Sequence, residues 1–458
     1  MNSIARANPP QTQVMGAVLH GEKTHIQSLS TFFDNWHDRG TTIEYVSPEE
    51  VQEYHLHALN LTLQYVWDNN AYYRDQLIQA GFDSPQLDSL QDLSRVPFLI
   101  KDTLQGDKDK LLCCDSRKIG QVHTTSGTTG QPLYLSYSLA DQFIHEFIPK
   151  YTTLFDDHEN DVVGIALPYE FSQAALGFQR LYQFIYGATV LSLGKGGYLS
   201  TIDKTLDILK VYNATILITT PSYASILAEE CEKLGIVLGE DIRLKKIWIT
   251  GEGCSPQFRN RLEDWWKCPV YFLYGSTEIG VIGVECSEHH GYHLAEGHVK
   301  VEVVDIQSGE PLAYGEVGEI VMTSLLKEAM PFIRYRTGDI GYLEKSNCSL
   351  GIQLDTLHLR GRMAGQLEID GKPVSPMMLE HFLMEVPDIS MWYHFILDED
   401  GFTIEVEPFK TDLTDEEIAE KVQRHMKQKV GLNFRVKVTS QLPRTYSKVN
   451  RIIRKPNE

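Results

Sequence analysis

The feature that most limits the fold is an alternation of short β-rich runs and longer helical stretches between residues 161 and 275. Strands that alternate with helices of about 10 to 15 residues are typical of βαβ units and a mostly parallel sheet. The pattern therefore predicts an α/β fold. The β-rich runs lie at 161–167, 187–193, 214–219, 245–250 and 269–275.

The segments on either side follow other patterns. Apolar residues recur at helical spacing from Pro48 to Gln79, and strands alternate around glycine turns from Gly297, which indicates an antiparallel β subdomain. Beyond residue 376 two helical patterns and several strands predict a small α+β domain. A chain of 458 residues is too long for one ordinary domain. We expect an N-terminal arm (1–45), a large domain (46–361), a hinge (362–365) and a small mobile C-terminal domain (366–458).

Composition excludes several classes of function. Lys and Arg total 42 against 62 Asp and Glu, and the resulting net charge of −20 disfavours nucleic acid and anionic membranes as partners. The sequence has no apolar run long enough for a membrane span and no signal-peptide pattern at its start, so we expect a cytoplasmic protein. Seven cysteines, an odd number, also favour a reducing compartment.

A segment rich in Ser, Thr and Gly, HTTSGTTGQPLYLSYS at 123–138, comes directly before a β-rich pattern. Hydroxyls and unhindered backbone N–H groups can wrap phosphates with little net positive charge. The nucleotide P-loop pattern GxxxxGK[ST] is absent. Taken alone, the segment fits a solvated turn better than a phosphate cradle.

Four further segments follow in a fixed order: GEGCS (251–255), YGSTEIG (274–280), RYRTGD (334–339) and LPRTYSKVNR (442–451). In this order and spacing the chain resembles the adenylate-forming superfamily, and more narrowly the phenylacetate-CoA ligase family. The narrower resemblance depends on NNAYYRDQL and LQDLSRVPFLIKDTLQ before the loop and on GEPLAYGEVGEIVMTSLLKEAMPFIRYRTGDIGYL after it. It covers roughly residues 50 to 456, and several independent motifs agree.

The resemblance implies an ATP site built from these motifs. A loop would cradle the β- and γ-phosphates, an adenine slot would lie at a strand end beside Tyr274, Asp339 would accept both ribose hydroxyls, and Arg362 would contact ribose and phosphate. The loop residues are Ser126, Gly127, Thr128, Thr129 and Gly130. The other nucleotide-binding candidates are Gly251, Glu252, Gly253, Tyr274, Gly275, Ser276, Asp339 and Arg362.

Three residues are implied to act in catalysis. Thr277 would touch the α-phosphate, and Glu278 would hold Mg²⁺, a hard cation that prefers carboxylate and phosphate oxygens. The ammonium of Lys448 would bridge the substrate carboxylate and the α-phosphate. The alternatives are a first-turn Glu that satisfies a helix dipole and a solvated tail Lys.

The acyl group is expected to bind an aromatic, apolar cleft formed by the segment 167–178 and residues around Gly275 and Ser276. Such a cleft suits an aryl or small hydrophobic carboxylic acid, although the same side chains could simply pack the core. No basic residue within 167–178 marks a second carboxylate. The candidates are Tyr169, Phe171, Ala174 and Ala175.

Two positions depart from the family pattern. Gln131 stands where the family has Lys, so one phosphate contact would lack its charge. In the hinge, Met363, Ala364 and Gly365 follow Arg362, and the family's pivot Asp is missing. Gly365 could supply backbone freedom instead. The missing Asp therefore argues more strongly against the second, thioester-forming step than against adenylation.

A metal site is a further expectation from the resemblance. Cys286, His293 and Cys348 lie where the family carries a Cys/His cluster, and they are candidate ligands for a structural Zn²⁺. Leu350 replaces the usual second Cys of a CxC pair, which leaves His289 or His290 to complete the set. A loop with a buried cysteine is the alternative.

These observations predict an ATP- and Mg²⁺-dependent ligase that converts a carboxylic acid to an acyl-adenylate and passes the acyl group to CoA. One alternative keeps the adenylation and transfers the acyl group to a carrier-protein thiol or an amine. Another is a nucleotide-binding or regulatory protein that has lost catalysis through Gln131 and Ala364, although Lys448, Glu278 and Asp339 together argue against it. We expect a homodimer.

Overall fold

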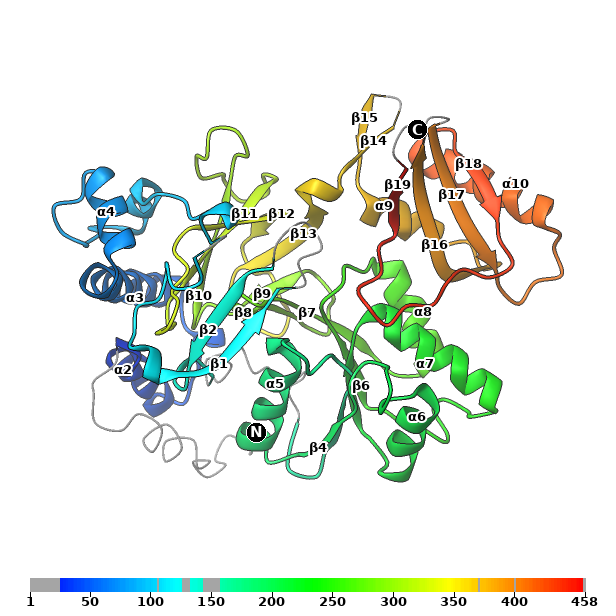
Figure 1. The fold of residues 1–458 in the computed structure, drawn as a ribbon, viewed down its shortest axis with the longest axis horizontal. Helices are drawn as coiled ribbons and strands as arrows, with labels where there is room; N and C mark the ends of the chain where they lie inside the picture. The colour runs from blue at the N-terminus through cyan, green and yellow to red at the C-terminus, as the bar shows by residue number, and fades with distance from the viewer. Residues whose placement is uncertain are drawn as a thin grey trace. The chain divides into compact units, whose positions relative to one another are not determined.

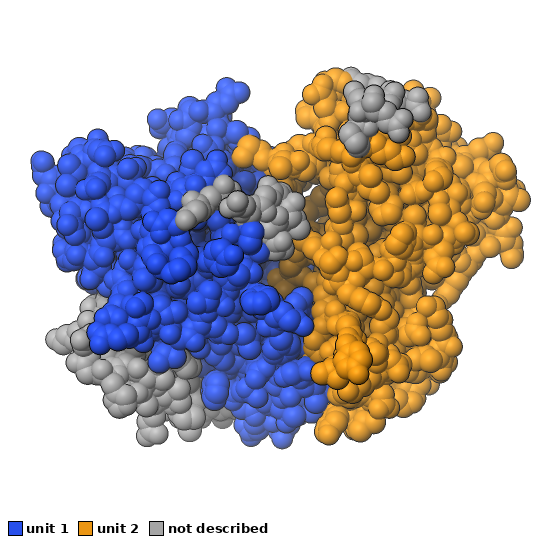
Figure 2. Space-filling model, viewed as in Figure 1, with its two compact units in different colours: residues 1–192, 271–359 blue, residues 193–270, 360–458 orange. Residues whose placement is uncertain are grey.

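The computed structural model describes residues 25–104, 107–125, 132–142, 157–369, 371–398 and 401–455. The chain forms two compact units, coloured separately in Figure 2. Unit 1 comprises residues 1–192 and 271–359, and unit 2 comprises 193–270 and 360–458. The boundary between residues 359 and 360 falls just before the expected hinge, and the limits of the functional domains stay a prediction.

Capping residues define where α3 begins in unit 1. The Ser47 side chain accepts the Glu50 N–H at 3.3 Å and Pro48 occupies the first turn of α3, so the helix predicted from residue 48 is confirmed. Within the expected N-terminal arm, α2 packs on α3, with the rings of Trp36 and Tyr54 5.7 Å apart. The α-helices of this unit are α2 (His25–Asp38), α3 (Pro48–Asn69), α4 (Ala71–Gln79) and α5 (Gln173–Arg180). The shorter helices are η1 (Ile43–Tyr45), η2 (Leu90–Arg95), η3 (Lys101–Leu104), η4 (Ser116–Lys118) and the π-helix η6 (Leu181–Tyr186).

Most strands of unit 1 form an antiparallel array with the neighbour order β10-β11-β12-β13-β9-β8-β7 (Figure 1). Apolar residues alternate with polar ones along β10, as expected for a sheet with one buried face. The antiparallel subdomain predicted from Gly297 is therefore confirmed. Two separate strands, β1 and β2, form a hairpin. The strands are β1 (Ile119–Thr124), β2 (Tyr134–Ser138), β3 (Val162–Ile165), β4 (Thr189–Ser192), β7 (Val270–Ser276), β8 (Gly280–Glu285), β9 (Tyr292–Leu294), β10 (Val299–Val304), β11 (Gly318–Ser324), β12 (Tyr335–Glu344) and β13 (Thr356–Arg362).

The predicted parallel pairing occurs in both units. In unit 1, β3 pairs in parallel with β4, and in unit 2, β5 (Ile216–Thr219) pairs in parallel with β6 (Lys246–Ile249). All residues of β5 and β6 are buried, as expected for parallel strands covered on both faces. The α/β prediction for this part of the chain is confirmed.

The C-terminal part of unit 2 is the predicted α+β fold. Its four-stranded sheet has the order β18-β17-β16-β19, with two parallel pairs flanking the antiparallel pair β16 and β17. A capping box between Thr414 and Glu417 starts α10, and Gly431 ends it in the left-handed region. The remaining elements of unit 2 are α6 (Ile202–Val211), α7 (Pro221–Leu234), α8 (Pro256–Trp266), η7 (Met363–Gly365), β14 (Leu367–Ile369), β15 (Lys372–Val374), α9 (Pro376–Leu383), β16 (Ile389–Asp398), β17 (Gly401–Pro408), α10 (Asp415–Val430), β18 (Arg435–Val438) and β19 (Ile452–Arg454).

Over the described ranges, every helix is too short or too polar to span a bilayer.

Candidate active site

The end of β7 and the middle of β12 bring two predicted nucleotide-binding residues together. The Tyr274 hydroxyl donates to Asp339 Oδ2 at 2.7 Å, and Asp339 is buried. A Cβ at Gly275 would lie 2.7 Å from the Gly280 carbonyl oxygen, so the adjacent turn requires glycine. The Ser276 hydroxyl accepts the Ile279 N–H at 3.2 Å, which stabilises the turn. The YGSTE and YRTGD motifs thus meet within unit 1.

Glu278, the predicted Mg²⁺ ligand, is fixed from two directions. The Tyr335 hydroxyl donates to Glu278 Oε1 at 3.3 Å, and Lys327 Nζ donates to the Glu278 carbonyl oxygen at 2.6 Å. Lys327 is fully buried, and this burial lowers the pKa of its ammonium to about 8, against the opposing effect of Asp141 and Glu278. Its Nζ lies 3.9 Å from the centre of the Tyr137 ring. The half-buried Glu278 carboxylate therefore lies beside a buried cation.

The hairpin β1–β2 leads to the Ser/Thr/Gly loop. Thr125 closes its neck, because the Thr125 N–H donates to the Leu133 carbonyl at 3.1 Å and the Thr125 hydroxyl accepts the Leu133 N–H at 3.0 Å. Tyr137 in β2 donates to the Thr277 carbonyl at 2.5 Å, which ties the hairpin to the catalytic candidate Thr277. The predicted loop residues Ser126, Gly127, Thr128, Thr129, Gly130 and Gln131 lie outside the described residues.

In unit 2, the GEG motif follows β6 directly. Gly251 adopts a φ of 81°, and Gly251 and Gly253 are exposed. Glu252 Oε1 forms an ion pair with Lys195 Nζ at 3.0 Å, and the side chains of Lys195 and Glu252 are only 3% and 9% exposed. A buried pair of this kind requires both partners, because either charge alone would be costly. The pair fixes the Glu252 carboxylate and leaves the neighbouring glycine backbone accessible.

The segment before Lys448 is anchored within unit 2. Arg444 donates to Glu229 and Glu407 with four contacts of 2.7 to 2.9 Å. The Tyr446 ring packs against Gly196, where a Cβ would come within 2.5 Å of it. Lys448 itself and Arg362 are exposed. At the expected hinge, Met363–Gly365 form the turn η7, and the positive φ of 106° belongs to Gly361, just before it.

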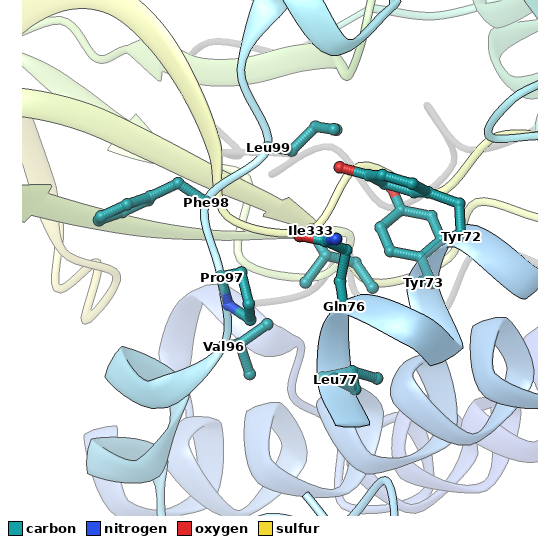
Figure 3. A pocket seen from close by; sticks show the side chains of 9 residues that line it. All are labelled: Tyr72, Tyr73, Gln76, Leu77, Val96, Pro97, Phe98, Leu99 and Ile333. Carbon is teal, nitrogen blue, oxygen red and sulfur yellow. The ribbon is translucent and has the colours of Figure 1, made fainter. Parts of the chain in front are cut away.

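The predicted acyl-pocket residues differ in exposure. Phe171 is 71% exposed with a φ of 55°, Ala175 is fully buried, and Tyr169 and Ala174 are half-buried. A separate pocket in unit 1 contains none of them (Figure 3). It lies between α4 and the segment after η2, and Figure 3 shows mostly apolar and aromatic side chains facing it. It is lined by Tyr72, Tyr73, Gln76, Leu77, Val96, Pro97, Phe98, Leu99 and Ile333.

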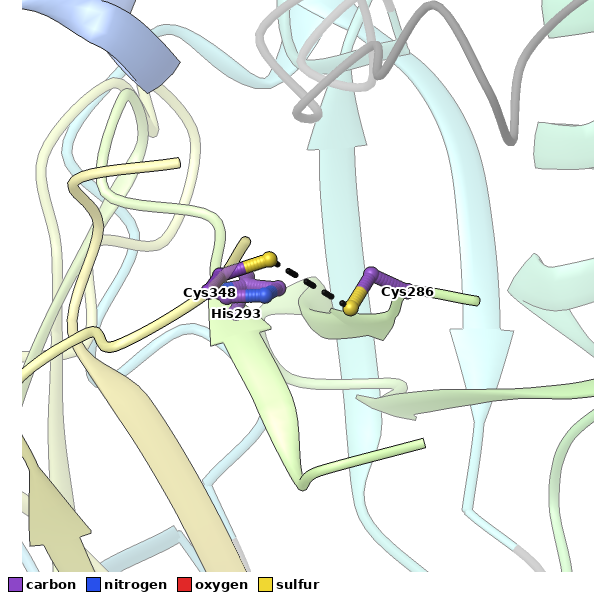
Figure 4. A group of neighbouring side chains, drawn as sticks. All are labelled: Cys286, His293 and Cys348. Atoms are coloured by element: carbon purple, nitrogen blue, oxygen red, sulfur yellow. Dashed lines mark hydrogen bonds between the residues drawn. The ribbon is translucent and has the colours of Figure 1, made fainter. Parts of the chain in front are cut away.

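The three predicted zinc ligands converge (Figure 4). The ligand atoms of Cys286, His293 and Cys348 lie within 4.8 Å of one another, and the two sulfur atoms are 3.7 Å apart. Burial raises the pKa of the Cys348 thiol to about 12. His289 and His290 face carboxylates instead, Glu285 at 3.1 Å and Glu344 at 3.2 Å. The donor set suits Zn²⁺, with three protein ligands in place of the usual four of a structural site.

Four contributors to these sites were missed by sequence reasoning: Lys195, Lys327, Tyr137 and Tyr335. Each reaches its partner across many residues of chain; the separation is 57 for Lys195 and Glu252 and 49 for Lys327 and Glu278. The one available signal was a lysine inside the apolar run SLLKEAM, because buried lysines are rare unless paired.

Comparison with known proteins agrees with this arrangement. A phenylacetate-coenzyme A ligase of Thermus thermophilus is 29% identical over 425 residues, covering 86% of this chain and 93% of the relative. A phenylacetate-coenzyme A ligase of Escherichia coli K12 is 26% identical over 429 residues, covering 90% and 96%. A crystal structure of 2-hydroxyisobutyryl-CoA ligase in the postadenylation state, in complex with 2-HIB-AMP, has a TM-score of 0.83 at 21% identity, covering 90% of this chain and 91% of that one. The last of these shows the shared fold.

Two family models match the chain. The model of the AMP-binding enzymes matches residues 64–325, and that of the AMP-binding enzyme C-terminal domain matches 371–455. Together they cover the YGSTE motif, the GEG motif and the segment that carries Lys448. The resemblance drawn from the motifs is confirmed, and the chain belongs to the AMP-binding enzyme family.

Proposed function

We propose that this protein activates a carboxylic acid with ATP and transfers the acyl group to CoA. A carboxylate oxygen attacks the α-phosphorus, the bond to the β-phosphate oxygen breaks, and pyrophosphate leaves. The CoA thiol then loses its proton and attacks the acyl carbonyl, and AMP leaves with the electron pair of the mixed-anhydride bond. The observation that carries the proposal is the contact between Tyr274 and Asp339, which joins two motifs 65 residues apart.

The held position of Glu278 supports a role for this residue in binding Mg²⁺. A bound Mg²⁺ would neutralise developing charge on the phosphates. Lys327 and Tyr335 fix the Glu278 backbone and carboxylate, so the side chain loses little conformational freedom when it binds the ion. Asp339 would accept the ribose hydroxyls beside Tyr274. Thr277, whose carbonyl is held by Tyr137, would present its side chain to the α-phosphate.

In the same proposal the acceptor is CoA, with a carrier-protein thiol or an amine as the alternative. The names of the phenylacetate-CoA ligase relatives favour CoA. The hinge, which lacks the family's Asp, is the feature that keeps the alternative open. We also propose a cytoplasmic location, because all seven cysteines are free thiols, as a reducing compartment would keep them. We propose a homodimer as well.

The direct test is carboxylate-dependent exchange of labelled pyrophosphate into ATP over a panel of aryl and short aliphatic acids. Exchange with particular acids is expected without any thiol, because adenylation precedes acyl transfer. AMP release should then accelerate with CoA, whereas acceleration only by a carrier protein or an amine would favour the alternative acceptor. Absence of exchange with every acid would overturn the proposal.

We further propose that Cys286, His293 and Cys348 bind Zn²⁺, with a water molecule or a further side chain completing the coordination. We expect about one zinc per chain by mass spectrometry of the metal content, as a single tetrahedral site would hold. Cys348→Ser should lose most of that zinc. Cys114→Ser, at a half-buried cysteine outside the cluster, is the matched control and should keep it. Equal zinc content in both variants would show that the metal binds elsewhere.

A further inference from the structure

The last residue of α5, Arg180, contacts the β1–β2 hairpin and the segment that follows it through its guanidinium. Its Nε donates to the Gln142 carbonyl at 3.3 Å, and its Nη1 donates to Gln121 Oε1 at 3.2 Å. Its Nη2 is buried and has no hydrogen-bond partner among the residues that the structure describes. Within that part of the chain, two N–H bonds of a cation therefore remain unsatisfied.

This guanidinium also lacks a counter-ion, since no carboxylate of the described residues pairs with it. Burial lowers its pKa to about 10, and the phenol of Tyr137 is the one neighbour that opposes this effect. Other buried guanidiniums differ: Arg334 pairs with Glu302, and Arg261 donates to three backbone carbonyls. The Arg180 side chain is half-buried, and its Nη2 is shielded from solvent. A guanidinium shielded in this way without a counter-ion is costly, so its retention indicates a ligand that supplies the missing anion.

The contacts of Arg180 connect it to the reaction-site candidates. Gln121 lies opposite Tyr137 in the hairpin, and Tyr137 donates to the Thr277 carbonyl. Arg180 also ends α5, the helix that carries the acyl-pocket candidates Ala174 and Ala175.

The groups around the guanidinium leave it free to bind an anion. Burial and the Arg180 charge lower the pKa of His123 to about 4, so this imidazole is neutral near pH 7 and carries no competing charge. The phenol of Tyr137 is likewise neutral, because burial raises its pKa well above the usual value. Two other charged side chains, Lys327 and Asp141, lie near the same Tyr137, but within the described residues neither pairs with Arg180. The Nη2 edge of Arg180 can donate two charge-assisted hydrogen bonds.

We propose that Arg180 binds a second carboxylate of the substrate, at the end opposite the activated one, and that the substrate class is dicarboxylic acids. This inference rests on the proposed function. It changes the expectation from sequence, where no basic residue within 167–178 marked a second carboxylate, because Arg180 lies two residues beyond that segment. An apolar acid would leave the guanidinium unpaired, and the site would select against it.

The test compares acids that differ by one carboxylate in the pyrophosphate-exchange assay: butanoate with succinate, benzoate with terephthalate, and phenylacetate with 4-carboxyphenylacetate. For at least one pair, kcat/KM of the wild type should be at least tenfold higher with the diacid. Arg180→Gln should lower that value at least tenfold, mainly through KM, and should change exchange with the monoacid less than twofold. Arg180→Lys should recover part of the loss. Arg117→Gln, at an exposed arginine of the same unit, is the control.

A second readout uses the thermal unfolding midpoint with and without each acid, which needs no turnover. A diacid should raise the midpoint of the wild type and not that of Arg180→Gln. If this shift occurs without exchange, Arg180 binds the diacid, but the proposed adenylation fails and with it the assignment of the diacid as its substrate. If exchange occurs but the wild type prefers monoacids, or Arg180→Gln affects all acids equally, the inference is overturned and the proposed function stands. Absence of both effects overturns both.

Discussion

The two units hold their predicted functional side chains in different ways. In unit 1, Tyr274 and Asp339 bond to each other, and Glu278 is held by Tyr335 and Lys327. In unit 2, Lys448 is exposed, and the segment before it is anchored through Arg444 and Tyr446. The first arrangement is preorganised for a ligand that binds to a fixed frame. In the second arrangement, the anchoring residues Arg444 and Tyr446 are distinct from the exposed Lys448 that they position.

The difference assigns separate tasks to neighbouring residues of the C-terminal segment. Arg444 forms charge-assisted bonds to two glutamates, and Tyr446 fills the space above Gly196. Lys448 follows two residues later and is exposed. Substitution at the anchor should therefore affect both stability and rate, and substitution at Lys448 should affect rate alone.

The largest effect is expected from Lys448→Ala. Loss of a charge that stabilises the transition state of adenylation should lower the exchange rate roughly 10²- to 10³-fold. Because Lys448 is exposed, the unfolding midpoint should stay within the small range of surface substitutions. Lys455→Ala, another exposed lysine of the same unit, serves as the control and should leave the rate unchanged. Equal rates in the two variants would remove Lys448 from the proposed mechanism.

A smaller effect is expected at the anchor from Gly196→Ala. The new Cβ would lie 2.5 Å from the Tyr446 ring, so the ring must move and the segment with it. We expect the exchange rate to fall roughly tenfold, within the ~10²-fold that a 1 Å misplacement costs.

Gly197→Ala is a matched control for that variant. Gly197 also has a positive φ, 116°, but no atom lies within 4 Å of its would-be Cβ. It therefore carries the backbone strain without the clash. If both variants lose the same activity, strain alone explains the loss, and the Tyr446 contact does not position Lys448.

Local sequence signals predicted much of this molecule. Caps and periodicity located α3 and the C-terminal α+β fold, and the alternation of strands and helices predicted the parallel pairs β3 with β4 and β5 with β6. Short motifs also predicted that Tyr274 and Asp339 belong to one site, because their order matches a known family. These signals lie within a few residues of one another or in a recognised order.

The contacts that could not be predicted from the sequence join segments that lie far apart along the chain. Arg180 reaches Gln121 across 59 residues, and this contact depends on where α5 ends and on the side to which each β1 residue points. A shift of one residue in a strand would turn Gln121 to the other face of the hairpin. No local pattern records such a register. The contacts made by the cations Arg180, Lys195 and Lys327 thus appear only once the fold is known.

The smallest effect is expected in the pH dependence of stability, through the buried ammonium of Lys327 in unit 1. The pKa of Lys327 is lowered from 10.5 to about 8 by burial, so between these values the unfolded chain binds a proton that the native protein has released. Wild-type stability should therefore rise with pH relative to Lys327→Met, by at most about 1.4 kcal/mol per pH unit. Urea unfolding of both proteins at pH 7.5, 8.5 and 9.5 measures this difference. A constant difference would mean that Lys327 titrates as in the unfolded chain, and that the frame around Glu278 is more hydrated than its burial indicates.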